Sequence, residues 1–409
     1  MVERRNSAPL GASAPLRADV GTGNAQTRQH NLSSVITNLH HSGSLTRAEL
    51  TRRTGLNRST VAALVGELED AGLAFETAAP EGGGVGRPSP LVHANGKVAA
   101  LALNPDVDAI DLGLVGLGGL LHARVRHATS SAPSAAATVR WVRKLLEKLQ
   151  PSLDECQVVG IGVAVPGLVQ SETGVVTLAP HLDWHDEPLA QMLAEATGYP
   201  AFAGNDANLG MIAETVFGAG RGVSDLVYLN GSTSGIGAGV LAGGRPLWGA
   251  RGYAAELGHT LINSNGRRCH CGQRGCLETE VNLHRLHAAL GAEPLTLSAE
   301  AMQRAMRGGA GSAIKVEVRR QLDLLGQAIA GFVSTFNPEL VLLGGFLGTL
   351  HDTMPSRLEA CVSRQTFAPA AAGLKIQCVG LGENLLMVGA AELAFQALLA
   401  NPIGNVEAR

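Results

Sequence analysis

The sequence predicts an α/β protein in two parts, an N-terminal winged helix-turn-helix domain followed by two α/β lobes around a cleft. Three observations predict it. Three short helical segments with their own caps or stop signals lie within residues 28–72. From Lys97 onward, strand-like segments alternate with helical ones, and this pattern occurs twice. Between Glu256 and Glu278, a polar loop gathers three cysteines, two histidines and two carboxylates.

Composition limits the classes of function. At 409 residues the chain can form two or three domains, each with its own core. Aromatic residues make up 3%, which argues against a stacking platform for single-stranded nucleic acid. The net charge of −3 makes no general case for binding a polyanion, so any DNA contact must come from one local region.

Neither a membrane span nor a signal peptide is indicated. No run approaches the roughly 18 apolar residues of a spanning helix, and the N-terminus lacks an apolar signal core. Three of the six cysteines fall in one metal-like cluster, which fits a reducing compartment. We therefore expect a cytoplasmic protein that does not contact a membrane.

The N-terminal segment is expected to be a disordered arm over residues 1–27, because it is rich in Ala, Ser, Gly, Pro and Arg without periodicity. Structure is expected to begin near Asn31, where apolar residues follow the spacing of an amphipathic helix. These residues are Leu32, Val35, Ile36 and Leu39.

Two further helices complete a helix-turn-helix. Thr46 and Glu49 form a capping-box pattern, and Gly55 ends that helix. Asn57 can cap the third helix, which closes at Gly72. Its predicted apolar face consists of Val61, Leu64, Val65 and Leu68.

A glycine-rich hairpin is predicted next, because E-G-G-G-V-G-R-P-S-P separates two short β-capable segments within 73–92. Helices and hairpin together predict a winged helix over residues 28–95, whose third helix would enter the DNA major groove. The predicted base contacts are Arg58, Ser59, Thr60 and Ala63. The predicted phosphate contacts are Arg47, Arg52, Arg53 and Arg58, and Arg87 would enter a narrow minor groove.

An alternative for this region is a small helical dimerisation module with a solvated basic face. Acidic side chains nearly offset the arginines, so charge alone does not decide between the two. They are Glu67, Glu69 and Asp70.

The remaining chain predicts two lobes over residues 96–409. The predicted strands are 98–103, 109–117, 158–165, 200–203, 226–229, 235–241 and 340–345. The predicted helices are 135–149, 316–336 and 384–399.

The polar loop predicts a metal site at residues 259–276. Cys269, Cys271 and Cys276 offer three thiolates, and His259 offers a fourth donor. Three sulfurs and one imidazole suit a closed, structural Zn²⁺ site. The alternative is a set of buried thiols or a disulfide, which a C-x-C pair cannot easily form and which leaves the third cysteine unexplained.

Together these motifs resemble the ROK family (repressor, open reading frame, kinase), specifically its winged-helix transcriptional repressors. The E-L-G-H and C-H-C-G-Q-R-G-C-L-E signatures carry the resemblance. P-G at 166–167, N-D-A-N at 205–208 and L-G-G at 343–345 support it in the expected order. The resemblance covers about residue 28 to the C-terminus. It implies a two-lobed actin-like ATPase/sugar kinase fold with a sugar between the lobes.

The resemblance also implies the sugar-binding residues, which are Asn205, Asp206, Glu256, His259 and Glu278. Carboxylates and an amide suit this role because each can hold two hydroxyl groups. Zinc bound by His259 would hold the two glutamates in place. The alternative for Asp206 is a turn or cap residue.

In the kinases of the family, Asp206 would take the proton from the sugar hydroxyl, and a D-x-G-G-T motif would hold the nucleotide phosphates. Residues 104–108 stand at that motif but lack its glycine pair and threonine. Asp106 and Asp108 would repel a triphosphate there. The second phosphate motif survives partly at 232–239. Because phosphoryl transfer depends on positioning and charge neutralisation, the loss of the first motif argues against kinase activity.

Three functions remain open. The leading one is a repressor that binds a double-stranded DNA operator as a homodimer or homotetramer and responds to a sugar or sugar phosphate. The second is a zinc-containing sugar kinase that phosphorylates a hexose with ATP. The third is a DNA-binding global regulator without a ligand response, which the intact sugar-site residues argue against.

Overall fold

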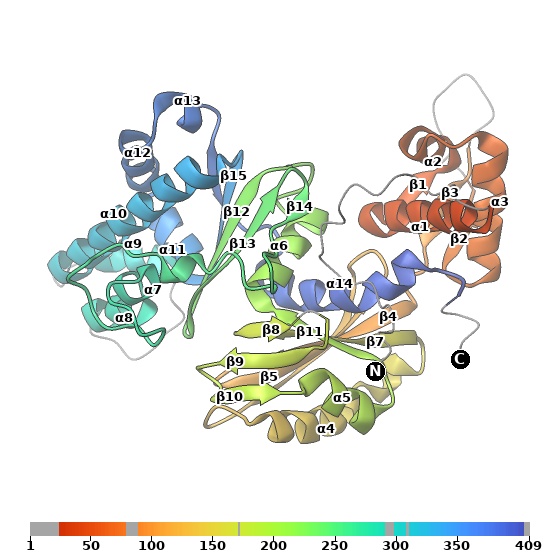
Figure 1. Cartoon of the computed structure of the whole chain (residues 1–409), viewed down its shortest axis with the longest axis horizontal. Helices are drawn as coiled ribbons and strands as arrows, with labels where there is room; N and C mark the ends of the chain where they lie inside the picture. Colours follow the sequence, from red (N-terminus) through yellow and green to blue (C-terminus); the bar gives the residue numbers. More distant parts are fainter. Residues whose placement is uncertain (1–23, 79–88, 171, 291–297, 308–310, 405–409) are drawn as a thin grey trace, which may run out of the picture.

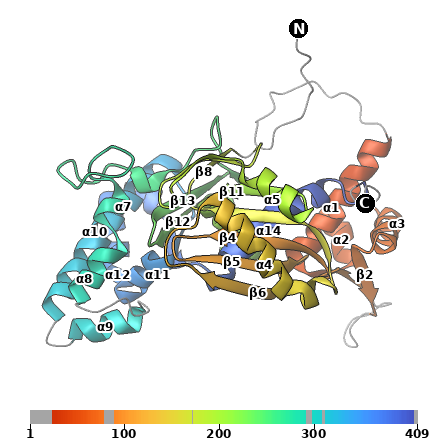
Figure 2. The same cartoon turned by 90° about the horizontal axis from the view of Figure 1, so that it is seen from below.

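A helical head and two α/β lobes make up the protein (Figure 1). The computed structural model describes residues 24–78, 89–170, 172–290, 298–307 and 311–404. The sheet of one lobe lies between the head at one end and the helical part of the other lobe at the opposite end (Figure 2). The predicted fold class is therefore confirmed.

The head is a winged helix. Its elements are α1 (Asn24–Ser42), β1 (Ser44–Thr46), α2 (Arg47–Thr54), α3 (Arg58–Asp70), β2 (Ala74–Thr77) and β3 (Leu91–Ala94). The strands form one antiparallel sheet in the order β1-β3-β2. The capping box between Thr46 and Glu49 is present, Gly55 is left-handed at φ 71°, and Asn57 caps α3.

The start of the head differs from the prediction. α1 begins at Asn24, so it includes the last residues of the predicted arm and starts before the predicted Asn31. Residues 25–30 are exposed and all but Ala25 are polar, so no apolar periodicity marked them. Arg28 instead pairs with Glu67 of α3, with 3.0 Å between Nε and Oε2, and only the tertiary structure supplies that partner. The rest of the predicted arm and Arg87 lie outside the described residues.

The two lobes share one sheet topology. In lobe 1 the strands lie in the order β11-β7-β4-β5-β6. The first three of these along the chain, β4, β5 and β6, are antiparallel, and β7 and β11 then add parallel to β4. Lobe 2 repeats this arrangement in the order β14-β13-β12-β15-β16. The strands of lobe 1 are β4 (Val98–Pro105), β5 (Ala109–Gly116), β6 (Leu121–Ala128), β7 (Gln157–Val165) and β11 (Ala201–Asn205). Those of lobe 2 are β12 (Leu226–Ser232), β13 (Gly235–Ala242), β14 (Arg245–Pro246), β15 (Leu340–Gly344) and β16 (Lys375–Cys378).

Helices cover these sheets. Lobe 1 carries α4 (Ala135–Leu153), α5 (Leu189–Thr197) and a small sheet of β8 (Leu168–Gln170), β9 (Val175–Ala179) and β10 (Trp184–Glu187). α6 (Asp206–Phe217) follows β11. Lobe 2 carries α7 (Leu277–Glu280), α8 (Leu283–Leu290), α9 (Ala299–Arg307), α10 (Gly311–Phe336), α11 (Gly345–Thr353), α12 (Pro355–Gln365) and α13 (Ala368–Ala371). α10 begins earlier than the predicted residue 316, with Ile314 buried in the core of lobe 2.

The last helix, α14 (Leu385–Ala400), belongs to the core of lobe 1. Leu101 and Leu103 of β4 face the α4 side, while the small residues Ala100 and Ala102 face α14. Small side chains on that face let the helix approach the sheet closely. The segment 382–400 is long and apolar enough to cross a membrane, but 56% of it is buried inside this fold.

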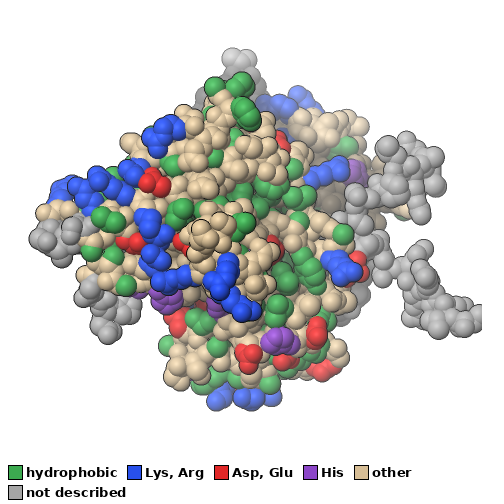
Figure 3. Space-filling view, turned by 60° about the vertical axis from the view of Figure 1, so that its left-hand side comes forward, with side chains coloured by type: hydrophobic (Ala, Val, Ile, Leu, Met, Phe, Trp, Pro, Cys, Tyr) green, Lys and Arg blue, Asp and Glu red, His purple; other side chains and the backbone are tan. Residues whose placement is uncertain are grey.

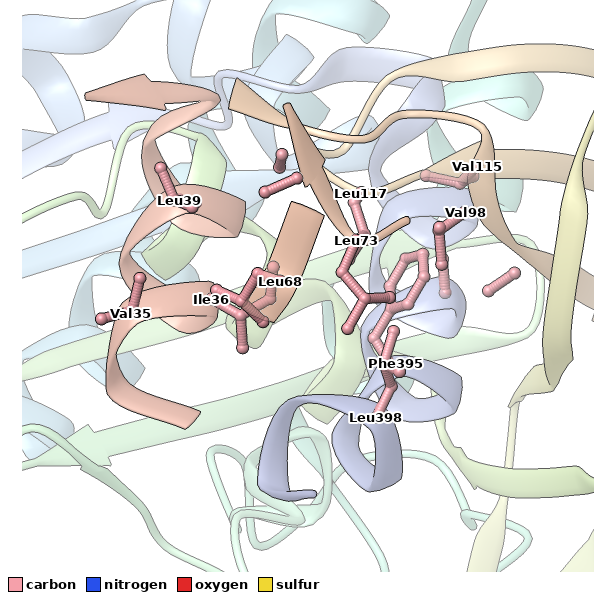
Figure 4. Close-up of a cluster of buried hydrophobic side chains, with 14 of the residues drawn as sticks. Val35, Ile36, Leu39, Leu68, Leu73, Val98, Val115, Leu117, Phe395 and Leu398 are labelled. Carbon is pink, nitrogen blue, oxygen red and sulfur yellow. The ribbon is translucent and has the colours of Figure 1, made fainter. Parts of the chain in front are cut away.

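The same core continues into the head (Figure 4). Residues of α1 and α3 and Leu73 lie in one cluster with residues of β4, β5 and α14. We call the contact between the head and lobe 1, including α14, the joint. Its labelled members are Val35, Ile36, Leu39, Leu68, Leu73, Val98, Val115, Leu117, Phe395 and Leu398.

Candidate ligand-binding cleft and metal cluster

The N-D-A-N motif lies where β11 ends and α6 begins. The Oδ1 atom of Asn205 accepts the backbone N–H of Asn208 at 3.0 Å, which caps α6. Its Nδ2 atom donates to the carbonyl oxygen of Gly167 at 3.1 Å and to Asp206 Oδ1 at 3.4 Å. Both polar ends of Asn205 are therefore engaged within the protein. Asp206 is placed at the first position of the helix by this cap.

Asp206 sits in an environment that disfavours its charge. Burial raises the pKa of its carboxyl from 3.8 to about 7, and the nearby carboxylates Asp106 and Glu256 add to the rise. The backbone N–H of Ala207 donates to Oδ1 at 2.8 Å and opposes the shift without cancelling it. A carboxyl group in this state can both donate and accept hydrogen bonds near neutral pH.

The other predicted sugar residues lie around the cysteine loop. Glu256 precedes the short helix η1 (Leu257–His259), and Glu278 lies on α7. His259 connects them, with 4.0 Å from Nε2 to Glu256 Oε2 and 3.5 Å from Nδ1 to Glu278 Oε1. Burial and the charge of Glu278 raise the pKa of Glu256. Electrostatic coupling between Asp206 and Glu256 extends this group to α6.

The four predicted metal ligands come together. The donor atoms of His259, Cys269, Cys271 and Cys276 all lie within 4.8 Å of one another. The Cys271 and Cys276 sulfurs are 3.6 Å apart, and Cys269 Sγ is 3.5 Å from His259 Nδ1. Tetrahedral zinc with bonds of about 2.3 Å to sulfur and 2.0 Å to nitrogen requires roughly 3.8 Å and 3.5 Å for such pairs. The residues therefore fit a tetrahedral metal ion.

Two glycines let the loop close around these donors. Gly272 and Gly275 have φ angles of 94° and 70°, in the region that favours glycine. A Cβ atom at Gly275 would lie 1.6 Å from the carbonyl oxygen of Asn263.

A competing donor was not predicted. His270 joins His259, Cys269 and Glu278 in a second set of donor atoms within 4.8 Å of one another. The Cys269 thiol donates to Glu278 Oε1 at 3.0 Å, and His270 Nδ1 lies 3.2 Å from the same oxygen. Glu278 thus touches the metal cluster directly and is only 8% exposed. The signal in the sequence was His270 itself, between two cysteines.

A pocket of about 300 Å³ opens beside Glu278, and it contains basic residues that sequence reasoning missed. Arg267 and Arg268 line it together with the turn 232–235 between β12 and β13. Lys and Arg side chains also gather on the forward face of lobe 2 (Figure 3). Arg267 and Arg268 follow Asn263 and Asn265 in the sequence, where no local pattern marks them. Only the folded loop places the two arginines at the pocket.

The first hairpin of lobe 1 carries carboxylates at the cleft. Asp106 follows β4, and its Oδ1 atom accepts the N–H of Val107 at 2.7 Å. Burial raises the pKa of Asp106, and the neighbouring Asp108 raises it further. The charge of Asp106 also raises the pKa of Asp206, the residue that would be the base of a kinase.

The predicted DNA-contacting residues occupy the start of α3 and the helix before it. Arg58, Ser59 and Ala63 are exposed, and Thr60 is half-buried. Arg52 and Arg53 are also exposed. The structure does not bring Arg47 into this group, because it forms a two-bond ion pair with Glu76 of β2, including 2.8 Å from Nη2 to Oε2.

A winged helix with an exposed recognition helix, joined to two lobes with a polar cleft, defines a DNA-binding transcription regulator built on a sugar-kinase-like body. The chain belongs to the ROK family, which residues 102–397 match, and residues 33–83 match the MarR family.

Relatives differ in how much of the chain they cover. The xylose repressor of Bacillus subtilis (strain 168) is 28% identical over 360 residues, covering 87% of this chain and 92% of the repressor. The glucokinase of Thermotoga maritima is 36% identical over 220 residues, covering 50% of this chain and 69% of the kinase. A solved ROK family transcriptional regulator, a homologue of the Escherichia coli Mlc protein, aligns with a TM-score of 0.77 and 27% identity over 93% of this chain and 99% of its own.

Proposed function

We propose that this protein is a cytoplasmic transcriptional repressor that releases its operator when a sugar or sugar phosphate binds between the lobes. The observation that carries the proposal is the joint. One continuous apolar core connects the winged helix to lobe 1, so a change in the lobes can reach the head.

DNA recognition would use the start of α3. Arg58 and Ser59 would meet base edges or phosphates, with Thr60 beside them, and Arg52 and Arg53 would add phosphate contacts. Arg47 contributes only if its ion pair with Glu76 opens. A homodimer or homotetramer would place two heads on half-sites separated by a whole number of helical turns.

The ligand would sit among Asp206, Glu256 and Glu278. These carboxyl groups can hold adjacent hydroxyls, and Asn205 would act by fixing Asp206 rather than by binding alone. A phosphorylated sugar would find Arg267 and Arg268 beside Glu278. A 100-fold change in operator affinity requires about 2.7 kcal/mol of coupling between ligand and DNA.

A structural zinc ion would be held by His259, Cys269, Cys271 and Cys276. When bound, it would keep the loop closed and would not take part in chemistry. His259 would hold the position of Glu256 and Glu278, because it lies within 4.0 Å of both.

Sugar kinase activity is the alternative, and Asp106 argues against it. Its carboxylate stands at the position of the kinase phosphate motif, where backbone N–H groups and glycine are needed, and its charge adds to the rise in the pKa of Asp206. An ATP-consumption assay over hexoses and pentoses tests this directly. Turnover that disappears in Asp206→Ala would establish the kinase instead.

Gel shifts with genomic DNA fragments, repeated with a panel of sugars and sugar phosphates, test the regulator. We expect a retarded band that one ligand class abolishes. Arg58→Ala should weaken binding by about tenfold and reduce the salt dependence by roughly one charge. Arg364→Ala on α12 serves as the matched control. DNA binding that no ligand alters would favour a regulator without ligand response.

A further inference from the structure

A second cavity lies at the joint, apart from the cysteine loop. It encloses about 330 Å³ between α1, α14 and the β11–α6 connection. Ser33 and Thr37 contribute from α1, Gln396 from α14, and Trp248 from the segment after β14. Cavities between domains are common ligand sites in proteins.

The lining is apolar and uncharged, with a few polar side chains. Leu209, Leu393 and Leu399 form much of its wall, and no Asp, Glu, Lys, Arg or His belongs to its described lining. Transfer of a charged group into such a space would lack a partner for the charge. A ligand for this cavity is therefore neutral.

Except for Asn205, whose two polar ends are engaged, the polar side chains of this cavity have unpaired groups within the described part of the chain. Asn208 is only 4% exposed, and its Oδ1 atom is buried without a hydrogen-bond partner there. The side chains of Ser33, Thr37, Trp248 and Gln396 also form no hydrogen bond with any described residue. Buried polar groups in folded proteins are normally paired, so the Asn208 oxygen favours a bound hydrogen-bond donor. The half-buried side chains of Ser33, Thr37, Trp248 and Gln396 are free to bond the same molecule.

We propose that this cavity is a binding site for a small neutral molecule with a flat apolar body and hydroxyl groups at its ends. The indole of Trp248 and the leucines would cover the flat body. The hydroxyls of α1 at one end and the amides of Asn208 and Gln396 at the other would take its polar ends.

Occupancy would hold the head against lobe 1. The molecule would touch α1 of the head and α14 and α6 of lobe 1 at the same time. Asn205, which caps α6 and positions Asp206, also lines the cavity. The site therefore adds a second input to the joint, and Asn205 connects it to the sugar cleft.

The probe is 4-hydroxybenzyl alcohol, a neutral ring with a hydroxyl group at each end. Full-length protein labelled with 5-fluorotryptophan gives one ¹⁹F signal for each of its three tryptophans, and Trp248→Phe assigns the relevant one. We expect that signal to shift saturably with a Kd on the order of 1–10 mM, as for a fragment of about nine heavy atoms. The signals of Trp141 and Trp184 should stay in place.

Matched ligands and variants decide the result. 4-Hydroxybenzoate, which carries a charge, should not shift the Trp248 signal, and Ser33→Phe should abolish the shift by filling the cavity. Thr37→Val should weaken it while leaving the other two signals unchanged, which guards against misfolding. When the probe concentration is ten times its Kd, some α1 amides should exchange hydrogen about tenfold more slowly. These are the amides that exchange only when the joint opens.

Three outcomes would overturn the site: no saturable shift of the Trp248 signal, an equal shift in Ser33→Phe, or an equal shift with the benzoate. Glu256→Gln separates this test from the sugar cleft. The shift should persist in that variant even when sugar response is lost.

Discussion

The cleft and the joint are built on opposite principles. In the cleft, carboxyl groups crowd together, and burial with like charges raises the pKa of Asp206 to about 7. In the joint, apolar side chains surround one polar pair, in which His40 Nε2 lies 2.6 Å from Glu392 Oε1. His40 Nδ1 accepts the N–H of Gly118 at 2.9 Å, so the ring proton is on Nε2 and donates to Glu392.

On the proposed function, sensing belongs to the cleft and transmission to the joint. A polar ligand would stabilise the cleft, because its hydrogen bonds would offset the unfavourable burial and crowding of the carboxyl groups. Around His40 the joint is closely packed and both ring nitrogens are engaged, so a polar ligand would find no unpaired group near Glu392. Apart from the cavity lined by Ser33 and Trp248, this core can respond only by moving with lobe 1, which suits a mechanical connection to the head.

The largest expected effect is loss of the metal cluster. Cys276→Ser removes one of the proposed zinc ligands, a buried cysteine, and we expect zinc content to fall from about one ion per chain toward zero. Stability should fall by several kcal/mol, on the order of 3–5, with loss of ligand response. Elemental analysis and thermal unfolding measure this. Cys156→Ser, outside the cluster, should keep its zinc, and a Cys276→Ser protein with full zinc would exclude the assigned ligand set.

The joint should respond nearly as strongly. Phe395→Ala empties a fully buried position between the head and lobe 1 and should cost about 3–5 kcal/mol in urea unfolding. Phe367→Ala removes the same ring from a site that is 77% exposed and should cost under about 0.5 kcal/mol. Equal costs for the two variants would show that the joint does not contribute to the fold as described.

The buried pair within the joint should have a smaller effect. Glu392→Leu leaves the His40 N–H without an acceptor and should cost about 1–3 kcal/mol. Glu392→Gln keeps an acceptor oxygen and should lose less. Measuring operator affinity together with stability tests whether this pair also transmits the ligand signal from lobe 1 to the head. A Leu variant as stable as the Gln variant would mean that the pair has no structural role.

The smallest effect concerns Asp206. With a folded-state pKa near 7 and an ordinary value of 3.8, the folded protein binds more protons than the unfolded chain between these values. Stability therefore falls as pH rises through this window. Asp206→Asn removes that titration, so relative to wild type its stability should rise by about 1 kcal/mol between about pH 6 and pH 7. The stability of Asp70→Asn, a change at an exposed site, should depend on pH as that of the wild type does. The same pH dependence for Asp206→Asn and wild type would refute the raised pKa of Asp206.

Local chemistry made much of the fold predictable. The cap residues Thr46 and Asn57 and the turn at Gly55 mark the head because their effects depend on neighbours in sequence. The clustering of the proposed metal ligands was predictable for the same reason, since three of the four donors lie within eight residues. The start of α1 was not, because Arg28 finds its partner Glu67 across the head.

Sequence alone determined the winged helix, the repeated α/β pattern and the donor set of the metal loop, because caps, periodicity and close spacing act along the chain. The tertiary structure decided which side chains share a space across long separations. It placed Arg267 and Arg268 in the pocket beside Glu278, withdrew Arg47 into an ion pair with Glu76, and joined α1 to α14. Those contacts depend on how the elements pack, and no local pattern encodes the packing of segments hundreds of residues apart.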